Sequence, residues 1–365
     1  MATTMTVDYI AGTGTHVSSD SLPETTRGVY NRTLLTRAQP YLLHQRFGQQ
    51  HPLQQRSGQS MVFRRYEKLS QATTPLSDGV TPTGTTLVKR DYVAAIKPYG
   101  NFMVISDWVD MTHVDPVIQE ATKLMGENMG ETMDSVYREI LVAGTSVYYV
   151  AGDHGSAGSD AWVAGTSRDS ATTGVQGVLC RGVVDAVIRD LDGADAKHFT
   201  PMVNGSTRIN SFPIGKAYWC VIHTDQIHDL FSKYGGFTLG EEFTPVERYS
   251  NQTGVMETEV GKYRNVRFVA TTNAKIWLDA GDDYASGVYK SETGVNCNVY
   301  AALFFARDAY GVIPLQRGAG STIVHKAGGS HDPLNQRNTV GWKGAGTAII
   351  LNDAWMRRVE CASLA

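Results

Sequence analysis

The sequence predicts an α+β fold that is rich in strands and loops and contains few long helices. Three observations predict it. Glycine makes up 37 of the 365 residues and threonine is abundant, which favours strands and turns. Two strand-like runs form a long hairpin over residues 60–97. One long amphipathic helix is expected directly afterwards, at 116–143.

Length and composition limit the classes of protein that are possible. A chain of 365 residues with 42% hydrophobic content can bury a large core, and chains of this size usually divide into two or more domains. Its 33 basic and 36 acidic residues give a net charge of −3, which excludes condensation of nucleic acid by a bulk positive field. No apolar run fits a membrane span, the first 20 residues lack the features of a signal peptide, and the four cysteines form no CxxC pair. We therefore expect no membrane contact, and free thiols in a reducing cytoplasm.

Residues 1–55 are predicted to form an extended N-terminal arm with short helical pieces. The segment is rich in Thr, Ser, Gln and Arg. An amphipathic stretch at 27–47 could dock on a surface, and Pro40 breaks it in two. An ordinary first helix of the core is the alternative.

The hairpin at 60–97 is the most informative feature of the chain. The runs SMVFRRYEKLS and TLVKRDYVAAIK flank the largely polar 15-residue stretch QATTPLSDGVTPTGT, and connections of that length are usually functional. A strand pair that buries one face on its own core alternates apolar and polar residues, whereas the middle of this hairpin is charged on both faces. Isolated hairpins are marginal in water. We therefore predict an arm that leaves its own body and lies on another subunit.

The residues expected to make inter-subunit contacts are the charged side chains of this hairpin. They are Arg64, Arg65, Glu67, Lys68, Asp78, Lys89, Arg90 and Asp91.

The long helix has clear boundaries in the sequence. Asp115 is a good N-cap, Pro116 suits the first helical position, and Gly144 ends the apolar periodicity. The interior glycines Gly126 and Gly130 each cost roughly 1 kcal/mol relative to alanine. They indicate close backbone packing or a bend.

Later segments alternate between strands and short helices. A surface loop or insertion is expected at 151–175, and a second amphipathic helix ends at Gly193. The remaining expected elements are a buried strand at 217–223, a short helix capped by Thr224, and strands within 257–277 and 298–314. The stretch 339–360 is expected to hold a glycine-rich turn and two strands.

No catalytic or cofactor motif is complete. The glycine clusters complete neither GxGxxG nor a P-loop, and GxSxG and HExxH are absent from the sequence. Three clusters of potential metal ligands occur, the first of which is His223, Asp225, His228 and Asp229. The second is Asp190, Asp192 and Asp195, and the third is Asp279, Asp282 and Asp283. The first has poor spacing for a metal site, and the second lacks the glycine and closing glutamate of an EF-hand, a weakness that the third shares, so helix-capping and turn roles are favoured. We expect no cofactor, no metal and no enzymatic activity.

As a set, these segments resemble the major capsid proteins of tailed phages. The resemblance is carried by FRRYEKLSQATTPLSDGVTPTG in the hairpin, by the Tyr99-Gly100 pair after it, and by three later blocks. These blocks are GKYRNVRFVATTNAKIW (261–277), FFARDAYGVIPL (304–315) and DPLNQRNTVGWKGAGTAIILNDAWMRRVE (332–360). The branch that looks most similar is the one typified by coliphage N-four.

The resemblance implies the Hong Kong 97-type capsid fold and its parts. These would be an N-terminal arm over 1–55, an E-loop over 56–97, a peripheral domain over 98–178, an axial domain over 179–325, and a return to the peripheral sheet over 326–365. Within the peripheral domain, 116–143 would be the spine helix and 151–175 an insertion.

The resemblance also implies a function. The chain would self-assemble as pentamers and hexamers into the icosahedral shell around a double-stranded DNA genome, with the E-loop and the N-terminal arm clamping neighbouring subunits. Further partners would be the portal, scaffolding or decoration proteins, and packaged DNA held without sequence specificity. The expected location is the virion, and the host cytoplasm during assembly. The alternatives are a tail-tube or decoration protein, which does not explain a capped long helix after a charged hairpin, and a soluble α/β enzyme, which would need a catalytic site.

Overall fold

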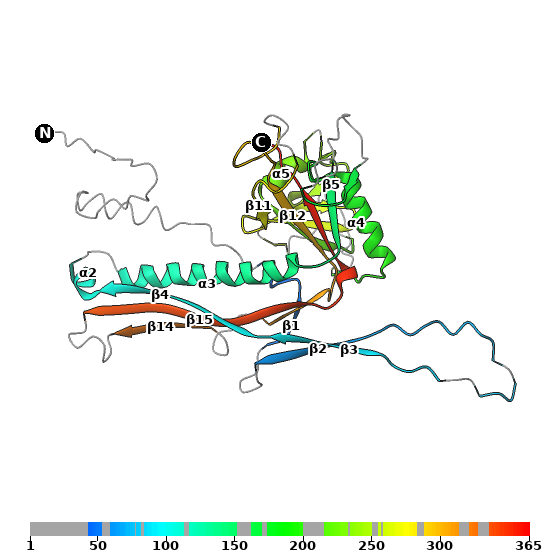
Figure 1. Ribbon diagram of the computed structural model, residues 1–365, viewed down its shortest axis with the longest axis horizontal. Coiled ribbons are helices and arrows are strands. Elements are labelled where there is room, and N and C mark those ends of the chain that lie inside the picture. Colours follow the sequence, from blue (N-terminus) through cyan, green and yellow to red (C-terminus); the bar gives the residue numbers. More distant parts are fainter. Residues whose placement is uncertain are drawn as a thin grey trace.

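The computed structural model describes residues 43–52, 59–76, 78–81, 84–112, 117–151, 162–169, 174–199, 215–232, 234–249, 255–256, 258–282, 288–313, 321–327 and 336–365. It has three parts: a long layer of helix on sheet, a body built on a larger sheet, and a hairpin arm that points away from the layer (Figure 1). The predictions for residues 1–42, for the cap at Asp115 and Pro116, and for much of the insertion at 151–175 lie outside the described residues.

The layer consists of one long helix on one face of a narrow sheet. Strand β15 (Arg337–Ile350) lies at its centre and pairs antiparallel with β4 (Lys97–Ser106) on one side. On its other side it pairs with β14 (Ser321–Ala327) and then with β13 (Tyr310–Ile313). A short helix, α2 (Asp107–Thr112), follows β4 directly and precedes the long helix α3 (Val117–Val142) in the chain. Ile105, Met125 and Trp342 form a buried cluster between the sheet and α3.

Helix α3 matches the predicted long helix, since both of its ends lie within one residue of 116 and 143. Gly126 in its interior is not explained by close packing, because a Cβ atom added there would meet nothing within 4 Å. The prediction of close backbone packing is therefore wrong for Gly126.

The body is a nine-stranded mixed sheet that runs in the order β6-β5-β16-β12-β7-β10-β9-β8, with β11 paired to β12. Its strands are β5 (Val147–Ala151), β6 (Val163–Gly165), β7 (Tyr218–His223), β8 (Phe243–Pro245), β9 (Glu259–Tyr263), β10 (Val266–Thr271), β11 (Ile276–Trp277), β12 (Val299–Phe305) and β16 (Met356–Cys361). The three central strands β7, β10 and β12 are buried at every residue, which explains why they read as nearly continuous apolar runs.

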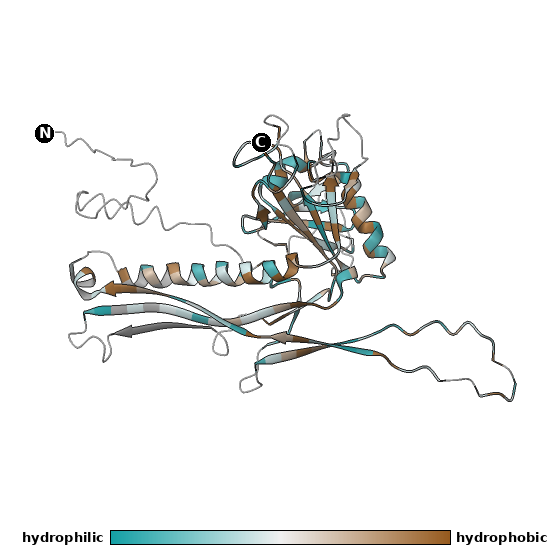
Figure 2. Cartoon of the chain, viewed as in Figure 1, coloured by the Kyte–Doolittle hydropathy of each residue, from teal (hydrophilic) through white to brown (hydrophobic). Residues whose placement is uncertain are grey.

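Short helices cover the body sheet. Helix α4 (Arg181–Gly193) buries one apolar face, including Val184, Val187 and Leu191, in the main core cluster, and α5 (Asp225–Leu230) follows β7. The described part of the body also contains the short 3₁₀ helices Val246–Arg248 and Asp353–Trp355. Figure 2 shows the hydrophobic residues concentrated inside this part of the chain.

Strand pairing places some segments differently from the predicted parts. Strand β16 belongs to the predicted return to the peripheral sheet, yet it lies inside the body sheet between β12 and β5. Strand β14 begins at Ser321, within the predicted axial segment, but pairs in the layer. Met356 and Val359 of β16 are fully buried, so this strand completes the core of the body.

The predicted glycine-rich turn within 339–360 is wrong, because β15 is one uninterrupted strand of 14 residues. Its glycines make room for neighbours. Gly341 lies opposite Phe102, whose Cβ would be 2.8 Å from an added Cβ. Gly346 lies beneath Tyr137 and Met133 of α3, where an added Cβ would be 2.5 Å from the Tyr137 hydroxyl.

We predict opposite effects for two glycine substitutions. Gly346→Ala pushes Tyr137 away from the Ile313 carbonyl, to which its hydroxyl donates a 3.0 Å hydrogen bond. It should lower the free energy of unfolding by about 2–4 kcal/mol. Gly126→Ala, in open space on α3, should raise it by up to about 1 kcal/mol. Equilibrium urea unfolding of the unassembled chain measures both, and equal effects would contradict the packing of α3 on β15.

Candidate inter-subunit surface

The hairpin arm (residues 59–96) is anchored on its own subunit at its base. Strands β2 (Ser60–Tyr66) and β3 (Lys89–Ala95) pair antiparallel from Ser60↔Ala95 to Tyr66↔Lys89. Phe63 and Ala94 are buried against Ile313 and Leu351. The ring of Phe63 fits because Gly311 has no side chain: a Cβ there would be 2.4 Å from the ring. The expectation of a hairpin with no face to bury is therefore wrong at the base of the arm.

The charged residues in the middle of the arm pair with one another across the two strands. Arg64 Nε donates to Asp91 Oδ1 over 2.8 Å, and this bond lowers the pKa of Asp91 below its ordinary value. Lys89 Nζ lies 3.8 Å from the other oxygen of the same carboxylate. Arg90 forms an ion pair with Glu67. These side chains are largely exposed, so each pair adds little stability, but together they define the shape of the arm.

Two further charged residues connect the arm to its own body. Arg65 donates to the Leu351 carbonyl over 3.2 Å, and its guanidinium lies 6.0 Å from the ring centre of Trp355. Lys68 Nζ donates to Asp195, just beyond α4, over 2.7 Å. Asp78 lies at the far end of the arm, before Gly79 in a positive-φ turn. Seven of the eight predicted interface residues thus have a partner within the chain, and a role for the eight at a subunit interface stays a prediction.

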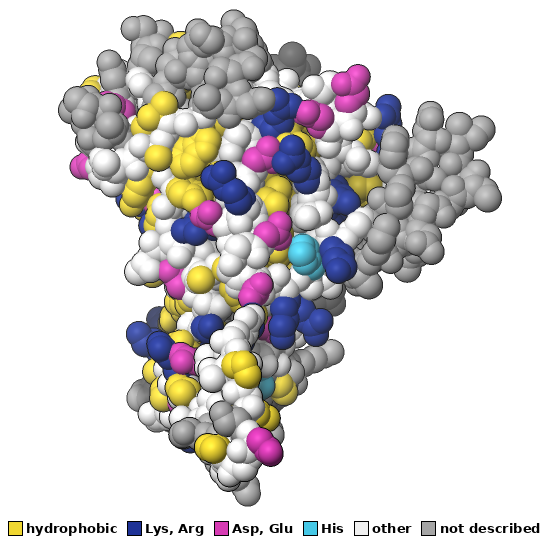
Figure 3. Space-filling view, turned by 90° about the vertical axis from the view of Figure 1, so that its right-hand side faces the viewer, with side chains coloured by type: hydrophobic (Ala, Val, Ile, Leu, Met, Phe, Trp, Pro, Cys, Tyr) yellow, Lys and Arg dark blue, Asp and Glu magenta, His cyan; other side chains and the backbone are white. Residues whose placement is uncertain are grey.

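The arm also presents apolar side chains that the sequence reasoning did not single out. The strands are shorter than predicted, so the irregular arm loop covers the 22 residues 67–88. Five of its aliphatic side chains are between 48% and 76% exposed. They are Leu69, Leu76, Val80, Leu87 and Val88. Figure 3, which views the molecule from the side that the arm points towards, shows hydrophobic side chains at this surface. The sequence signal that could have found them is that they are single apolar residues within a largely polar stretch.

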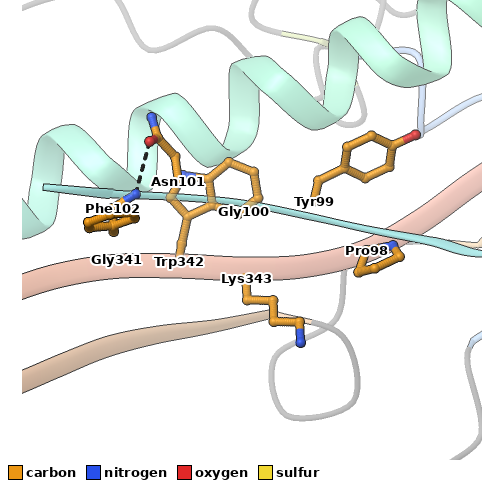
Figure 4. Close-up of a pocket in the computed structure, with 8 residues that line it drawn as sticks. All are labelled: Pro98, Tyr99, Gly100, Asn101, Phe102, Gly341, Trp342 and Lys343. Atoms are coloured by element: carbon orange, nitrogen blue, oxygen red, sulfur yellow. Dashed lines mark hydrogen bonds between the residues drawn. The ribbon is translucent and has the colours of Figure 1, made fainter.

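A shallow groove lies on the face of the layer sheet opposite to α3. Its volume is about 420 Å³, and its lining residues come from β4 and β15: Pro98, Tyr99, Gly100, Asn101, Phe102, Gly341, Trp342 and Lys343. Trp342 points towards α3, where its indole N–H donates to Asn128, while Lys343 points the other way (Figure 4). Because Gly100 faces Lys343 and Gly341 faces Phe102, each large side chain has an empty position opposite it. Phe102 is 69% exposed at this site.

Comparison with known proteins identifies the fold. A scan against protein-family models and a search of curated proteins give no match. Solved structures do match. The capsid of Ralstonia phage GP4 matches with a TM-score of 0.61 and 13% sequence identity, over 90% of this chain and 92% of its own. The capsid structure of the cyanophage P-SCSP1u matches with a TM-score of 0.54 and 14% identity over 90% of each chain. The head structure of the Helicobacter pylori bacteriophage KHP40 matches with a TM-score of 0.54 and 12% identity, over 90% of this chain and 92% of its own.

The chain has the Hong Kong 97-type capsid fold. These matches do not distinguish one branch of the family from another. Among the described helices, none combines the length and the apolar character that crossing a bilayer needs.

Two of the carboxylate clusters of this capsid fold have structural partners. Asp190 accepts hydrogen bonds from Tyr148 and Arg357, Asp192 accepts one from Tyr218, and the third carboxylate pairs with the arm. They therefore point to different neighbours. Within the described part of the chain, no three His, Cys, Asp or Glu side chains come together in a way that could hold a metal ion.

The cluster of His223, Asp225, His228 and Asp229 contacts the C-terminal end of the chain through Asp229. Asp225 accepts from Lys290 over 2.9 Å and from Tyr300 over 3.0 Å. Asp229 is buried and accepts from the Leu364 amide over 3.2 Å. Burial raises the pKa of Asp229 to about 6, although hydrogen bonds from Ser363 and Leu364 oppose this. His228 is exposed and does not join them.

This cluster predicts a pH dependence of stability. Folding favours the protonated form of Asp229. The protonated carboxyl therefore adds its full contribution to the free energy of unfolding below about pH 4, and this contribution is lost as pH rises from about 4 to 6. Asp229→Asn should therefore be more stable than the unchanged chain at pH 7.5, by on the order of 2–3 kcal/mol, and similar to it at pH 4. Urea unfolding at both pH values measures this.

Asp225→Asn is the control for this experiment. The pKa of Asp225 is lowered: burial opposes this, but hydrogen bonds from Lys290 and Tyr300 outweigh it. Its substitution should therefore destabilise the chain at pH 7.5. If Asp225→Asn stabilised the chain at pH 7.5, or if Asp229→Asn had no effect there, the raised pKa of Asp229 and the lowered pKa of Asp225 would both be in doubt as the cause of the pH dependence.

Proposed function

We propose that the chain is a major capsid protein that self-assembles into the icosahedral shell of a tailed bacteriophage around its double-stranded DNA. One observation carries this proposal. A subunit with the capsid fold extends an arm whose loop exposes five aliphatic side chains. Isolated exposed apolar residues are normal on a protein surface, but a projecting loop that presents several of them needs a partner surface.

A second copy of the same chain is the partner that fits best. The arm loop extends away from the layer that carries the groove, so the loop does not fill the groove of its own chain (Figure 1). Each half of the 22-residue loop could reach about 35 Å when extended. We propose that the arm loop seats its aliphatic side chains beside Phe102 in the groove of a neighbouring subunit.

Such an arrangement supports closed rings. The arm and the groove are two different patches, so their contact is heterologous, and repeated heterologous contacts form rings when the rotation closes. Fully burying one aliphatic side chain contributes about 1.5–3 kcal/mol, partly offset by the ordering of the loop. Many such contacts in a closed lattice reinforce one another without any single tight interface. This supports pentamers and hexamers as the units of the shell.

The remaining proposed partners follow from this role. A net charge of −3 suits a container that does not grip the packaged DNA. We also propose that the chain meets a portal protein, and scaffolding or decoration proteins, in the virion and, during assembly, in the host cytoplasm. The part before Leu43 would provide a second overlap between subunits.

The experiment that tests the function is expression of the chain, alone or with a phage scaffolding protein, followed by size exclusion and electron microscopy. Shells or capsomer rings support the proposal. Helical tubes would favour a tail-tube protein. A monomer of about 40 kDa that never assembles would favour a soluble enzyme.

We predict that the arm loop is dispensable for folding and required for assembly. Replacing residues 69–85 by the two-residue turn Asn-Gly should leave circular dichroism unchanged, because none of the residues that the structure describes in this range belongs to a strand or a buried cluster. The variant should form no shells in electron micrographs. Shells of normal stability would show that the arm is not the clamp.

A mixing experiment tests the docking site itself. Leu76→Asp places a charge on the arm loop and Phe102→Asp places one in the groove, and both positions are exposed. Neither variant should form shells alone. A mixture of the two retains one intact arm and one intact groove per pair, so it should form dimers that analytical ultracentrifugation detects. Shells from either single variant, or dimers from one variant alone, would contradict this site.

A further inference from the structure

A short segment of the chain is inserted where the layer meets the body. We call residues 43–52 the anchor segment. Its strand β1 (Gln49–Gln50) pairs in parallel with β13, and the His51 amide donates to the Val312 carbonyl over 3.0 Å. Leu43 and Phe47 are buried in a cluster that includes side chains of both α3 and the body sheet. The anchor segment therefore contacts both parts at once.

Aromatic packing fixes the anchor segment on the side of the body. The ring centre of Phe47 lies 5.1 Å from that of Trp219 on β7 and 6.2 Å from that of Phe305 on β12. The next residue, Gly48, has no space for a side chain, because an added Cβ would be 2.5 Å from Val312 and 2.6 Å from the ring of Tyr310. Removing Phe47 would leave a cavity between the two parts.

A buried carboxylate fixes the same segment on the side of the layer. Asp134 of α3 accepts from the His44 amide over 2.9 Å, and its other oxygen lies 2.9 Å from Nδ1 of the same histidine. Both side chains are fully buried. The pKa of Asp134 is lowered: burial opposes this, but the charge and hydrogen bonds of His44 outweigh it. An ionised carboxylate only accepts, so Nδ1 carries the proton in this pair.

The same carboxylate also reaches the body. Asn273, in the turn between β10 and β11, donates to Asp134 over 2.9 Å. Arg138 of α3 donates to the carbonyl of Asn273 over 2.7 Å. Lys275 forms an ion pair with Glu139 over 2.9 Å. One side chain of α3 thus joins the anchor segment, the helix and the body in a single polar node.

The polar fit of this node is incomplete. Among the described residues, Nε2 of His44 is buried and has no hydrogen-bond partner. An unsatisfied buried polar atom costs about 1–3 kcal/mol. The packing of the anchor segment is therefore less stable than its burial alone would give. This lower stability favours a segment that can detach from the fold.

We infer that the anchor segment is a removable wedge that fixes the angle between the helix–sheet layer and the body, and that the His44–Asp134–Asn273 node holds it in place. When the node opens, residues 43–52 detach from β13 and from Phe305, and the layer hinges on the body. Only Leu43 separates residues 1–42 from His44, so a partner that binds these residues acts on the wedge directly. Only this last consequence rests on the proposed capsid function.

Hydrogen exchange of the full, unassembled chain tests the inference. Asp134→Asn keeps the volume of the side chain but removes one acceptor from the node. Tyr310→Phe is a milder change that removes only the 2.6 Å hydrogen bond from Tyr310 to the His44 carbonyl. In both variants the amides of His44 and His51 should exchange at least tenfold faster, while amides between β7 and β10 keep their protection. Asp91→Asn, in the exposed ion pair on the arm, is the matched control and should leave the exchange rates of the His44 and His51 amides unchanged.

A distance measurement tests the hinge itself. The four native cysteines are buried, so spin labels attach selectively at Glu131→Cys on α3 and at Arg307→Cys on the body, both exposed positions. Pulsed electron resonance should give a narrow distance distribution in the otherwise unchanged chain. It should give a broader one after Asp134→Asn.

The outcomes separate this inference from the proposed function. A uniform rise in exchange across all strands, or an equally narrow distance distribution in the Asp134→Asn variant, would overturn the wedge. Neither result depends on shell formation. A chain that never assembles but shows the selective exchange would refute the capsid role and leave the wedge standing.

Discussion

The pairing of β15 with β4 supports every part of the subunit outside the body. Ten consecutive residues of β15 pair with β4, and α3 packs across the two strands. The arm begins where β4 begins, with only Ile96 between β3 and β4. At its other end β15 is connected to β16 of the body by residues 351–355, which include the 3₁₀ helix Asp353–Trp355. If this strand were shorter, neither the arm nor α3 would have a fixed direction relative to the body.

Much of the fold could be predicted from the sequence because its signals are local. The apolar spacing located α3 within one residue at each end, and the all-apolar runs located β7 and β12. The single strand β15 was missed because glycines usually indicate turns. Here Gly341 and Gly346 face Phe102 and Tyr137, and those neighbours are far away in sequence. Strand order is likewise non-local, which is why the place of β16 in the body was not foreseen.

The position of the hairpin arm was predicted from the sequence, but the pairing of its charged side chains was not. Charge on both faces of the hairpin correctly indicated an unusual strand pair. It did not indicate that Arg64 and Asp91 face each other, since register depends on the turn and on Phe63 at the base. The charges therefore shape the arm, and the apolar residues of its loop remain available for a partner. The buried node at Asp134 had no sequence signal, because its members are 90 and 139 residues from that carboxylate.

The near-continuity of β3 and β4 makes the arm a lever. Its direction is set by the twist of the layer, and the chain is interrupted only at Ile96. Strand β3 adds about 23 Å to the loop reach of about 35 Å, so a rotation of about 10° at that residue moves the tip by about 10 Å. Small changes of twist in the layer thus become large changes in where the tip lands. One sequence can in this way meet neighbours at the different angles that a closed, curved surface imposes.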